Sequence, residues 1–423
     1  MASLHAVHAL RGGASLITAS MPERHSASVV LMFGGGSRLE DERLAGVSHF
    51  IEHLNFKGTK KRPSSKAIAD AIEGVGGFIN ASTDKELTAY WARVPAEHLQ
   101  LGLDVLFDLV SNSNLNEDEV ERERLVILEE LRSYQDQPHE YVQNLFEELM
   151  WPDHPLGRDI AGTEQSVGQL TRDDILEFAN SQYRLPNLVI GAAGAVDGDG
   201  TVAIVEPLLT LPSQPDGAIQ PATPPVLGSP HVLVRRRQTE QAHICLGMRA
   251  TSYVHPDRYV LDLLNTVLGE GMSSRLFLNI REKLGLAYDV HSFVQRHRDT
   301  GYLGVYMGVE PKKAVDATTA VMEELRGLCS RDVSQEELVR AKEFTKGRLR
   351  LELETTNGVA FWLTYQALLL GEINTIEQEL AHVEAVTAAD IRRVANEVMS
   401  QPPQMAVIGP FSRDGGFRLA IGA

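Results

Sequence analysis

Two stretches of the chain repeat the same succession of hydrophobic and polar positions. Residues 90–132 fit a strand, an amphipathic helix, a turn and a second long helix, because their apolar side chains recur first at alternate positions and then at helical spacing. Residues 305–350 repeat that order of elements with the same apolar spacing. We therefore predict a duplication in which strands and helices alternate within each half.

A proline-rich segment separates the two halves. Residues 211–230, LPSQPDGAIQPATPPVLGSP, contain six prolines and show no hydrophobic period, which is typical of an interdomain linker. A chain of 423 residues is also too long for one ordinary hydrophobic core. We expect one domain at residues 1–211, a linker at 212–229 and a homologous domain at 230–423.

Composition narrows the class of protein. An apolar fraction of 43% indicates a globular chain, and no window approaches the apolar run that a membrane span needs. The N-terminus lacks the pattern of a signal peptide, and only Cys245 and Cys329 are present, so we expect a cytoplasmic protein without a membrane partner. The net charge of -17 argues against nucleic acid as a partner.

The two halves differ where the first contains histidines and carboxylates. Glu123 and Glu130 fall opposite Ala341 and Arg348, and the counterpart of GVSHFIEHLNF has neither histidine. A purely structural role would be kept in both copies. We therefore look for the chemistry of this protein in the first half.

His49 and His53 form a candidate metal site. At i and i+4 of a helix their rings project from one face, and Glu52 lies beside that face. A histidine pair at this spacing is commonly a surface or core pair, but the H-x-x-E-H order and a later carboxylate helix favour a ligand set. A hydrolytic zinc site needs three protein ligands, an open position for water and a base.

The third ligand is expected from the helix EVERERLVILEELR. Glu123 and Glu130 are seven residues apart and bracket Val126 and Ile127, which predicts a face with buried apolar positions turned towards a cation. Spacing alone leaves Glu129 as an alternative to Glu130.

The surroundings favour Glu130 over Glu129. Glu129 lies beside Arg132 and Ser133 and is expected to be solvated, whereas Glu130 has apolar or aromatic residues within a turn. His139 and His154 are rival ligands, but each stands in a proline-containing polar segment where a loop or turn role is expected.

Five stretches of the chain form a recognisable set of motifs: HFIEH, GGFINASTDKELTAYWARV, ERERLVILEEL, HPLGRDIAGT and SSRLFLNIREKLGLAYDV. Together they resemble the zinc peptidases with the inverted motif, which include pitrilysin, insulin-degrading enzyme and the mitochondrial processing peptidase. The resemblance covers essentially the whole chain, and the length of the chain is similar to that of bacterial members close to the beta subunit of the processing peptidase. Most members have an apolar residue or alanine where this chain has Asn55, a change that the sequence does not explain.

The resemblance implies an α+β fold of two homologous lobes, each an antiparallel-rich sheet covered by helices, facing each other across a chamber. The first lobe would hold zinc and the second would bind substrate without metal. The implied activity is a zinc-dependent endopeptidase, with one Zn2+ per chain, that acts on short or unfolded peptides. The alternatives are a non-catalytic or partner-dependent subunit of a peptidase complex, and a metal-free structural protein.

The resemblance also implies roles for individual residues of the first lobe. Zinc would be held by His49, His53 and Glu130, Glu52 would be the general base, and Glu123 would be a catalytic acidic residue that supports the site.

Substrate binding is expected in both lobes. The resemblance implies that Arg281 and Tyr288 hold the peptide in the second lobe. In the first lobe, GGFINAST has the alternation and glycine lead-in of an exposed edge strand, so we expect Phe78, Asn80 and Ala81 to add a peptide by backbone hydrogen bonds. Because the metal-binding residues and the Arg/Tyr pair are both intact, we expect a self-sufficient homodimer.

Overall fold

The computed structural model describes residues 5–213 and 221–423, so residues 214–220 of the expected linker lie outside the described part of the chain. The chain forms two compact units. Each unit takes a segment from the other half of the sequence: residues 350–375 join the first unit and residues 133–158 join the second. Unit 1 comprises Met1–Arg132, Asp159–Ala222 and Arg350–Thr375, and unit 2 comprises Ser133–Arg158, Thr223–Leu349 and Ile376–Ala423.

Unit 1 is built on a six-stranded sheet in the order β1-β2-β6-β3-β5-β4. Only β2 and β6 run parallel, and the other neighbours are antiparallel. The central strands β3 and β6 are apolar and buried along almost their whole length, which requires cover on both faces. The strands are β1 (Ala6–Ala9), β2 (Ser15–Ser20), β3 (Ser26–Gly34), β4 (Phe78–Thr83), β5 (Leu87–Pro95) and β6 (Leu188–Gly194).

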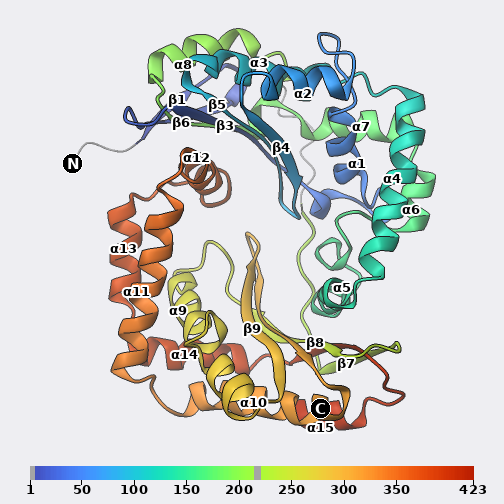
Figure 1. Ribbon diagram of the computed structural model, residues 1–423, viewed down its shortest axis with the longest axis vertical. Helices are drawn as coiled ribbons and strands as arrows, with labels where there is room; N and C mark the ends of the chain where they lie inside the picture. Colours follow the sequence, from blue (N-terminus) through green and yellow to red (C-terminus); the bar gives the residue numbers. More distant parts are fainter. Residues whose placement is uncertain (1–4, 214–220) are drawn as a thin grey trace. The chain divides into compact units, whose positions relative to one another are not determined.

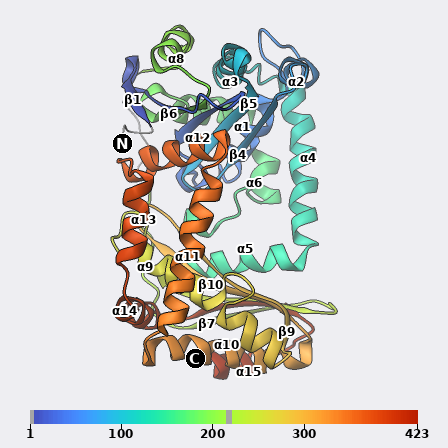
Figure 2. The same ribbon diagram turned by 60° about the vertical axis from the view of Figure 1, so that its left-hand side comes forward.

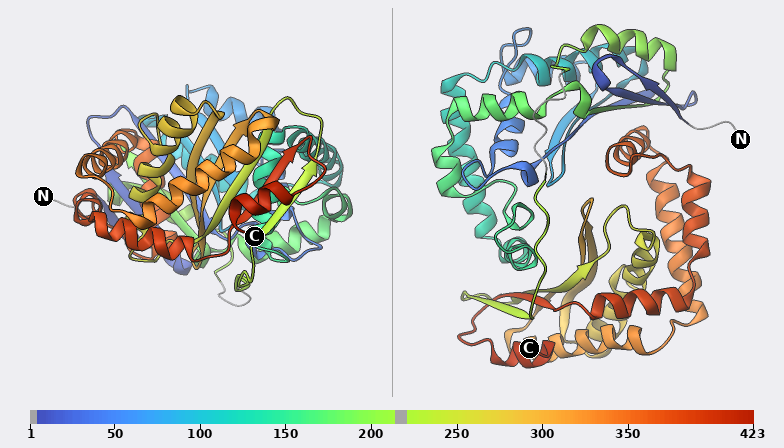
Figure 3. Two further views of the ribbon diagram at one scale, coloured as in Figure 1. Left: turned by 90° about the horizontal axis from the view of Figure 1, so that it is seen from below. Right: turned by 180° about the vertical axis from the view of Figure 1, so that it is seen from behind.

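Helices cover both faces of this sheet. Helices α3 and α8 lie on one face, and α12, which comes from the C-terminal half, lies on the other and packs on β3 and β6 (Figures 1 and 3). The helices of this unit are α1 (Val47–Asn55), α2 (Ser65–Glu73), α3 (Leu99–Asn112), α4 (Glu117–Gln135, whose last residues belong to unit 2), α6 (Glu164–Gln169), α7 (Arg172–Gln182), α8 (Gly198–Val205) and α12 (Thr356–Tyr365).

Unit 2 has a five-stranded sheet in the order β7-β11-β8-β10-β9. Its first pair is parallel and the rest are antiparallel, as in the strands β2-β6-β3-β5-β4 of unit 1. The predicted duplication is therefore confirmed at the level of topology. The strands are β7 (His231–Arg236), β8 (Ala242–Ala250), β9 (Ala287–Arg296), β10 (Gly301–Val309) and β11 (Gln404–Gly409).

The faces of the second sheet are covered in the same manner. Helix α5, from the N-terminal half, packs on β8 and β11 through an apolar cluster that includes Phe146 and Trp151, and α10 lies on the opposite side (Figure 2). The helices are α5 (Pro138–Met150), α9 (Arg258–Gly269), α10 (Ala314–Ser330), α11 (Gln335–Glu352, which ends in unit 1), α13 (Ile376–Ala385), α14 (Ala388–Met399) and α15 (Gly415–Ile421).

The expected fold class is confirmed. The chain is a mixed α and β structure with two antiparallel-rich sheets, each covered by helices. Along the described residues, no helix is both long enough and apolar enough to cross a membrane.

Candidate metal centre

Helix α1 separates a buried face from a face that carries the candidate ligands. Val47, Phe50, Ile51 and Leu54 are buried in the core of unit 1, as helical spacing requires. His49, Glu52 and His53 therefore project from the opposite side of the helix, next to α4 and β4.

The first turn of α1 is held by a buried carboxylate. Gly46 adopts a left-handed conformation with φ of 93°, and a Cβ atom there would lie 2.5 Å from the carbonyl oxygen of Ala161. With no side-chain cap at Gly46, Glu40 accepts hydrogen bonds from the backbone N–H groups of Gly46 at 2.7 Å and Ser48 at 2.8 Å. A negative charge at a helix N-terminus is favourable, so Glu40 stabilises the turn that precedes His49.

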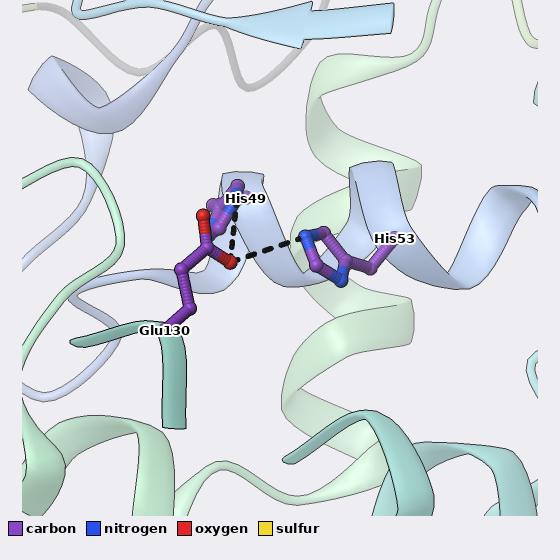
Figure 4. Close-up of side chains that lie close together, drawn as sticks. All are labelled: His49, His53 and Glu130. Carbon is purple, nitrogen blue, oxygen red and sulfur yellow. Dashed lines mark ion pairs between the residues drawn. The ribbon is translucent and has the colours of Figure 1, made fainter. Parts of the chain in front are cut away.

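Two imidazoles and one carboxylate converge on a single point (Figure 4). Oε2 of Glu130 lies 3.9 Å from Nε2 of His49 and 3.7 Å from Nε2 of His53. One ligand atom from each of the three residues lies within 4.8 Å of the others, and no second cluster of this kind occurs in the described part of the chain. Segments far apart in the sequence, α1 and α4, thus bring the set together.

This arrangement fits a zinc ion. Zinc–ligand bonds of about 2.0–2.2 Å in a tetrahedron place neighbouring ligand atoms roughly 3.3–3.6 Å apart, which is slightly closer than the two distances from Glu130 found here. Burial, assisted by the neighbouring His53, lowers the pKa of His49 to about 4, so its imidazole is neutral at physiological pH. Neutral imidazole is the form that binds metal, and three protein ligands leave a fourth position open.

Glu123 supports the metal-facing orientation of His53. Its side chain is 5% exposed, and one carboxylate oxygen lies 3.1 Å from Nδ1 of His53 while the other lies 2.7 Å from Nζ of Lys57. When His53 donates its Nδ1–H to this carboxylate, the lone pair on Nε2 points towards Glu130. A carboxylate behind a metal-binding histidine fixes the tautomer and raises the basicity of the ligand nitrogen.

Glu52 lies on the same side of α1 as the two histidines, and its carboxylate is hydrogen-bonded to β4. The hydroxyl of Thr83, at the end of β4, donates a hydrogen bond of 2.6 Å to Oε2 of Glu52. Burial raises the pKa of Glu52 above its ordinary value, and the hydrogen bond from Thr83 partly opposes that shift. A raised carboxylate pKa suits a general base, because efficient proton transfer needs a pKa closer to the working pH.

The burial of the residues around Glu123 and Glu130 on α4 agrees only in part with the expectation. Glu129 is exposed and lies 3.5 Å from Arg132, as expected, and Ile127 is buried. The prediction that Val126 is buried is wrong, because its side chain is 49% exposed. Successive helical residues are about 100° apart, so only one of two adjacent positions can face the core fully.

The two rival histidines lie in unit 2. His154 is buried and its Nδ1 accepts a hydrogen bond from the backbone N–H of Leu156, which is the expected turn role. The loop assignment of His139 is wrong: it occupies the first turn of α5, where Pro138 begins the helix. Its ring lies 6.4 Å from that of His243.

The expected edge strand is confirmed. Strand β4 pairs only with β5 and ends the sheet. Phe78 and Asn80 are exposed, while Ala81 is buried. A cavity of about 380 Å3 lies beside the strand, and Glu52 and His53 are among the residues that line it together with apolar side chains of α2 and β4.

Arg281 and Tyr288 lie together in unit 2. Arg281 belongs to a π-helical segment, Phe277–Lys283, and its guanidinium carbon lies 4.8 Å from the ring centre of Phe277 and 5.0 Å from that of Tyr288. Tyr288, near the start of β9, is 72% exposed. A charged donor and an aromatic hydroxyl are therefore presented to solvent side by side.

Three residues of this centre were not identified from the sequence. Thr83 falls within a stretch that resembles the family, but nothing in its spacing marks it as a partner of Glu52. Glu40 and Lys57 likewise carry no sequence signal. Glu40 acts through backbone groups on the other side of a loop, and Lys57 acts through Glu123, which is distant along the chain. Hydrogen bonds of this kind become visible only after the elements pack.

Two solved structures share the fold. A protease from Helicobacter pylori superposes with a TM-score of 0.91 at 24% identity and covers 96% of this chain and 100% of its own. A structure from Pseudomonas fluorescens, described as a peptidase M16 inactive domain, gives a TM-score of 0.88 at 18% identity over 96% of this chain and 98% of its own. At these identities the comparison concerns the fold alone.

Sequence comparison identifies the family. Residues 15–164 match the profile described as Insulinase (Peptidase family M16), and residues 169–344 match the profile described as Peptidase M16 inactive domain. Uncharacterized zinc proteases of Streptomyces coelicolor and Mycobacterium tuberculosis are 38% and 37% identical over 97% and 95% of this chain, and over 90% and 92% of their own. The uncharacterized zinc protease YmxG of Bacillus subtilis is 33% identical over 95% of this chain and 97% of its own. The resemblance inferred from the motifs is thereby confirmed, and the chain belongs to peptidase family M16.

Proposed function

We propose that this protein is a zinc-dependent endopeptidase that hydrolyses short or unfolded peptides. The convergence of His49, His53 and Glu130 beside Glu52 carries the proposal, because it supplies three zinc ligands and a base in one place. The zinc proteases among the relatives support the same activity.

In this proposal, different residues bind the metal, transfer the proton and orient the ligands. A zinc ion held by the three ligands supplies Lewis acidity towards a carbonyl oxygen and a water molecule. Glu52 takes a proton from the attacking water and passes it to the leaving amine, while the hydroxyl of Thr83 keeps its carboxylate in orientation. Glu123 keeps His53 in the tautomer that presents Nε2 to the metal.

The substrate binds as an extended strand in this proposal. The free edge of β4, at Phe78, Asn80 and Ala81, offers backbone groups for pairing with a peptide next to Glu52. Arg281 and Tyr288 hold the peptide backbone, since a guanidinium donates a planar set of hydrogen bonds and a phenol adds a hydroxyl.

We further propose a homodimer that needs no other subunit. The alternative is a non-catalytic or partner-dependent subunit, and the match of residues 169–344 to an inactive-domain profile is the observation that favours it. Sedimentation velocity of the purified protein, together with peptide hydrolysis by the same sample, distinguishes the two. Activity that appears only after a related subunit is added would support the alternative.

The central test measures zinc and turnover on the same preparations. A peptide library incubated with and without a chelator and analysed by mass spectrometry should show cleavage that the chelator abolishes. His49→Ala and His53→Ala should lose most zinc and activity, whereas the exposed control His25→Ala should keep both.

Glu52→Gln separates the base from the ligands. The variant keeps the size of the side chain but cannot take a proton, so zinc should remain while turnover falls about a hundredfold or more. Full zinc in both histidine variants, or a wild-type rate for Glu52→Gln, would refute the assignment.

A further inference from the structure

A chain of buried hydrogen bonds lies beneath the helix that carries the candidate ligands. Nδ2 of Asn55, the last residue of α1, donates to the hydroxyl of Tyr90 at 2.8 Å, and that hydroxyl lies 2.9 Å from the hydroxyl of Tyr183. All three residues are buried. Polar groups removed from water are costly unless they are bonded, so these groups depend on one another.

Each hydroxyl in the chain of bonds has a buried partner. The hydroxyl of Tyr90 accepts from Asn55, and either tyrosine hydroxyl can donate to the other. The hydroxyl of Tyr183 is also hydrogen-bonded to Thr88, whose own hydroxyl donates to the carbonyl of Gly35 at 3.3 Å. Removing any one link leaves a buried donor or acceptor without its partner.

The chain of bonds connects the metal helix to the sheet. Tyr90 lies on β5 directly opposite Ala81 of the edge strand β4 on one side and Leu31 of β3 on the other. Tyr183 follows α7 and packs against Phe33 of β3, with ring centres 4.7 Å apart. The last turn of α1 is thus bonded to the strand that positions β4.

The apolar side chains on the buried face of α1 have no hydrogen-bonding groups. Phe50, Ile51 and Leu54 pack by apolar burial, which depends on area and not on orientation. The hydroxyl of Ser48 on the same face has no hydrogen-bond partner among the described residues. Among the described residues, Asn55 is therefore the side chain that joins this face to the sheet by a hydrogen bond, two residues after His53.

We propose that the Asn55–Tyr90–Tyr183 chain is a positioning device that fixes the last turn of α1 against β5. Through that turn it sets the orientation of Glu52 and His53. This explains why an amide stands at residue 55, where the sequence offered no reason for one. The catalytic consequence rests on the proposed peptidase function, but the structural one does not.

The test compares Tyr90→Phe with the double variant Asn55→Leu/Tyr90→Phe. Tyr90→Phe removes one oxygen atom and orphans the Asn55 amide, so the melting temperature should fall. Turnover per bound zinc should fall about tenfold, because small misplacements of reacting groups are costly, while KM changes less than about twofold. Leucine has the branched shape of asparagine without its polar atoms, so the double variant should recover most of the melting temperature while turnover stays low.

A purely structural role gives a different result. In that case the double variant recovers melting temperature and turnover together, and the proposal is overturned. Tyr302→Phe is the matched control, because this buried tyrosine also loses a hydrogen bond, to Glu147 in unit 2. Its turnover per zinc should equal that of the wild type.

Amide hydrogen exchange tests the positioning without any activity. Residues 51–55 should exchange faster in Tyr90→Phe and in the double variant, whereas α3 should not change. Unchanged exchange in residues 51–55 would refute the proposal. If the wild-type protein hydrolyses no peptide, the proposed function fails by itself, and the exchange measurement still decides the role of the chain of bonds.

Discussion

Replacing Glu123 by glutamine should weaken zinc binding without removing a zinc ligand. The carboxylate is almost completely buried and is shared between Nδ1 of His53 and Nζ of Lys57. Glutamine keeps the shape and one acceptor oxygen, but it lacks the negative charge that raises the basicity of the imidazole. Loss of such a partner typically costs 10- to 100-fold in metal affinity, which corresponds to about 1.4–2.8 kcal/mol.

The two contacts of Glu123 can be separated. Lys57 is partly exposed, so its ion pair is screened by solvent, and Lys57→Met should weaken zinc binding by no more than about threefold. Most of the loss in Glu123→Gln should therefore come from the contact with His53.

The assay is a competition between the protein and a chromophoric zinc chelator at neutral pH. Glu129→Gln is the matched control, because it makes the same chemical change on the same helix at a side chain that is 76% exposed. It should bind zinc as the wild type does. Equal zinc affinity for Glu123→Gln and the wild type would refute the role of this carboxylate behind His53.

Four further outcomes are expected. Glu130→Gln should weaken zinc binding more than Glu123→Gln does, since it changes a ligand itself, and a smaller effect in the same competition assay would contradict that assignment. Thr83→Val should lower turnover with zinc retained, and Thr83→Ser should restore it by returning the hydroxyl to Glu52; failure of the serine variant to do so would show that the hydroxyl is not what matters. Arg281→Ala should keep full zinc and lose most peptide hydrolysis, and an undiminished rate would leave that residue without a substrate role. The hydrogen bond from Arg275 lowers the pKa of Glu337 to about 2 from an ordinary 4.5, so the stabilisation of the fold by this carboxylate is complete above pH 4.5 and is lost as pH falls towards 2. In urea unfolding, the free energy of unfolding should therefore depend less on pH in this acid range for Glu337→Gln than for the wild type, and an equal dependence would contradict the prediction.

The arrangement within one helix was determined by the sequence alone. His49, Glu52 and His53 share one side of α1 because residues three and four apart lie one above the other on any helix. The duplication was visible for a similar reason, since the apolar period of each strand and helix depends only on residues close together in the sequence. The preference for Glu130 over Glu129 rested on neighbours within a turn, of which Ile127 is buried but Val126 and Tyr134 are exposed.

Contacts between distant segments were decided only by the tertiary structure. Nothing in the local pattern predicts that α5 packs on the sheet of unit 2 and α12 on that of unit 1, because an amphipathic helix specifies a buried face but not its partner. The chain of bonds that begins at Asn55 could not be predicted either. Its partner Tyr90 and the next link, Tyr183, are 35 and 128 residues away, and the bonds form only when β5 and the end of α7 meet beneath α1. Hydrophobic period records which side of an element is buried, whereas hydrogen bonds between buried side chains depend on how whole elements meet.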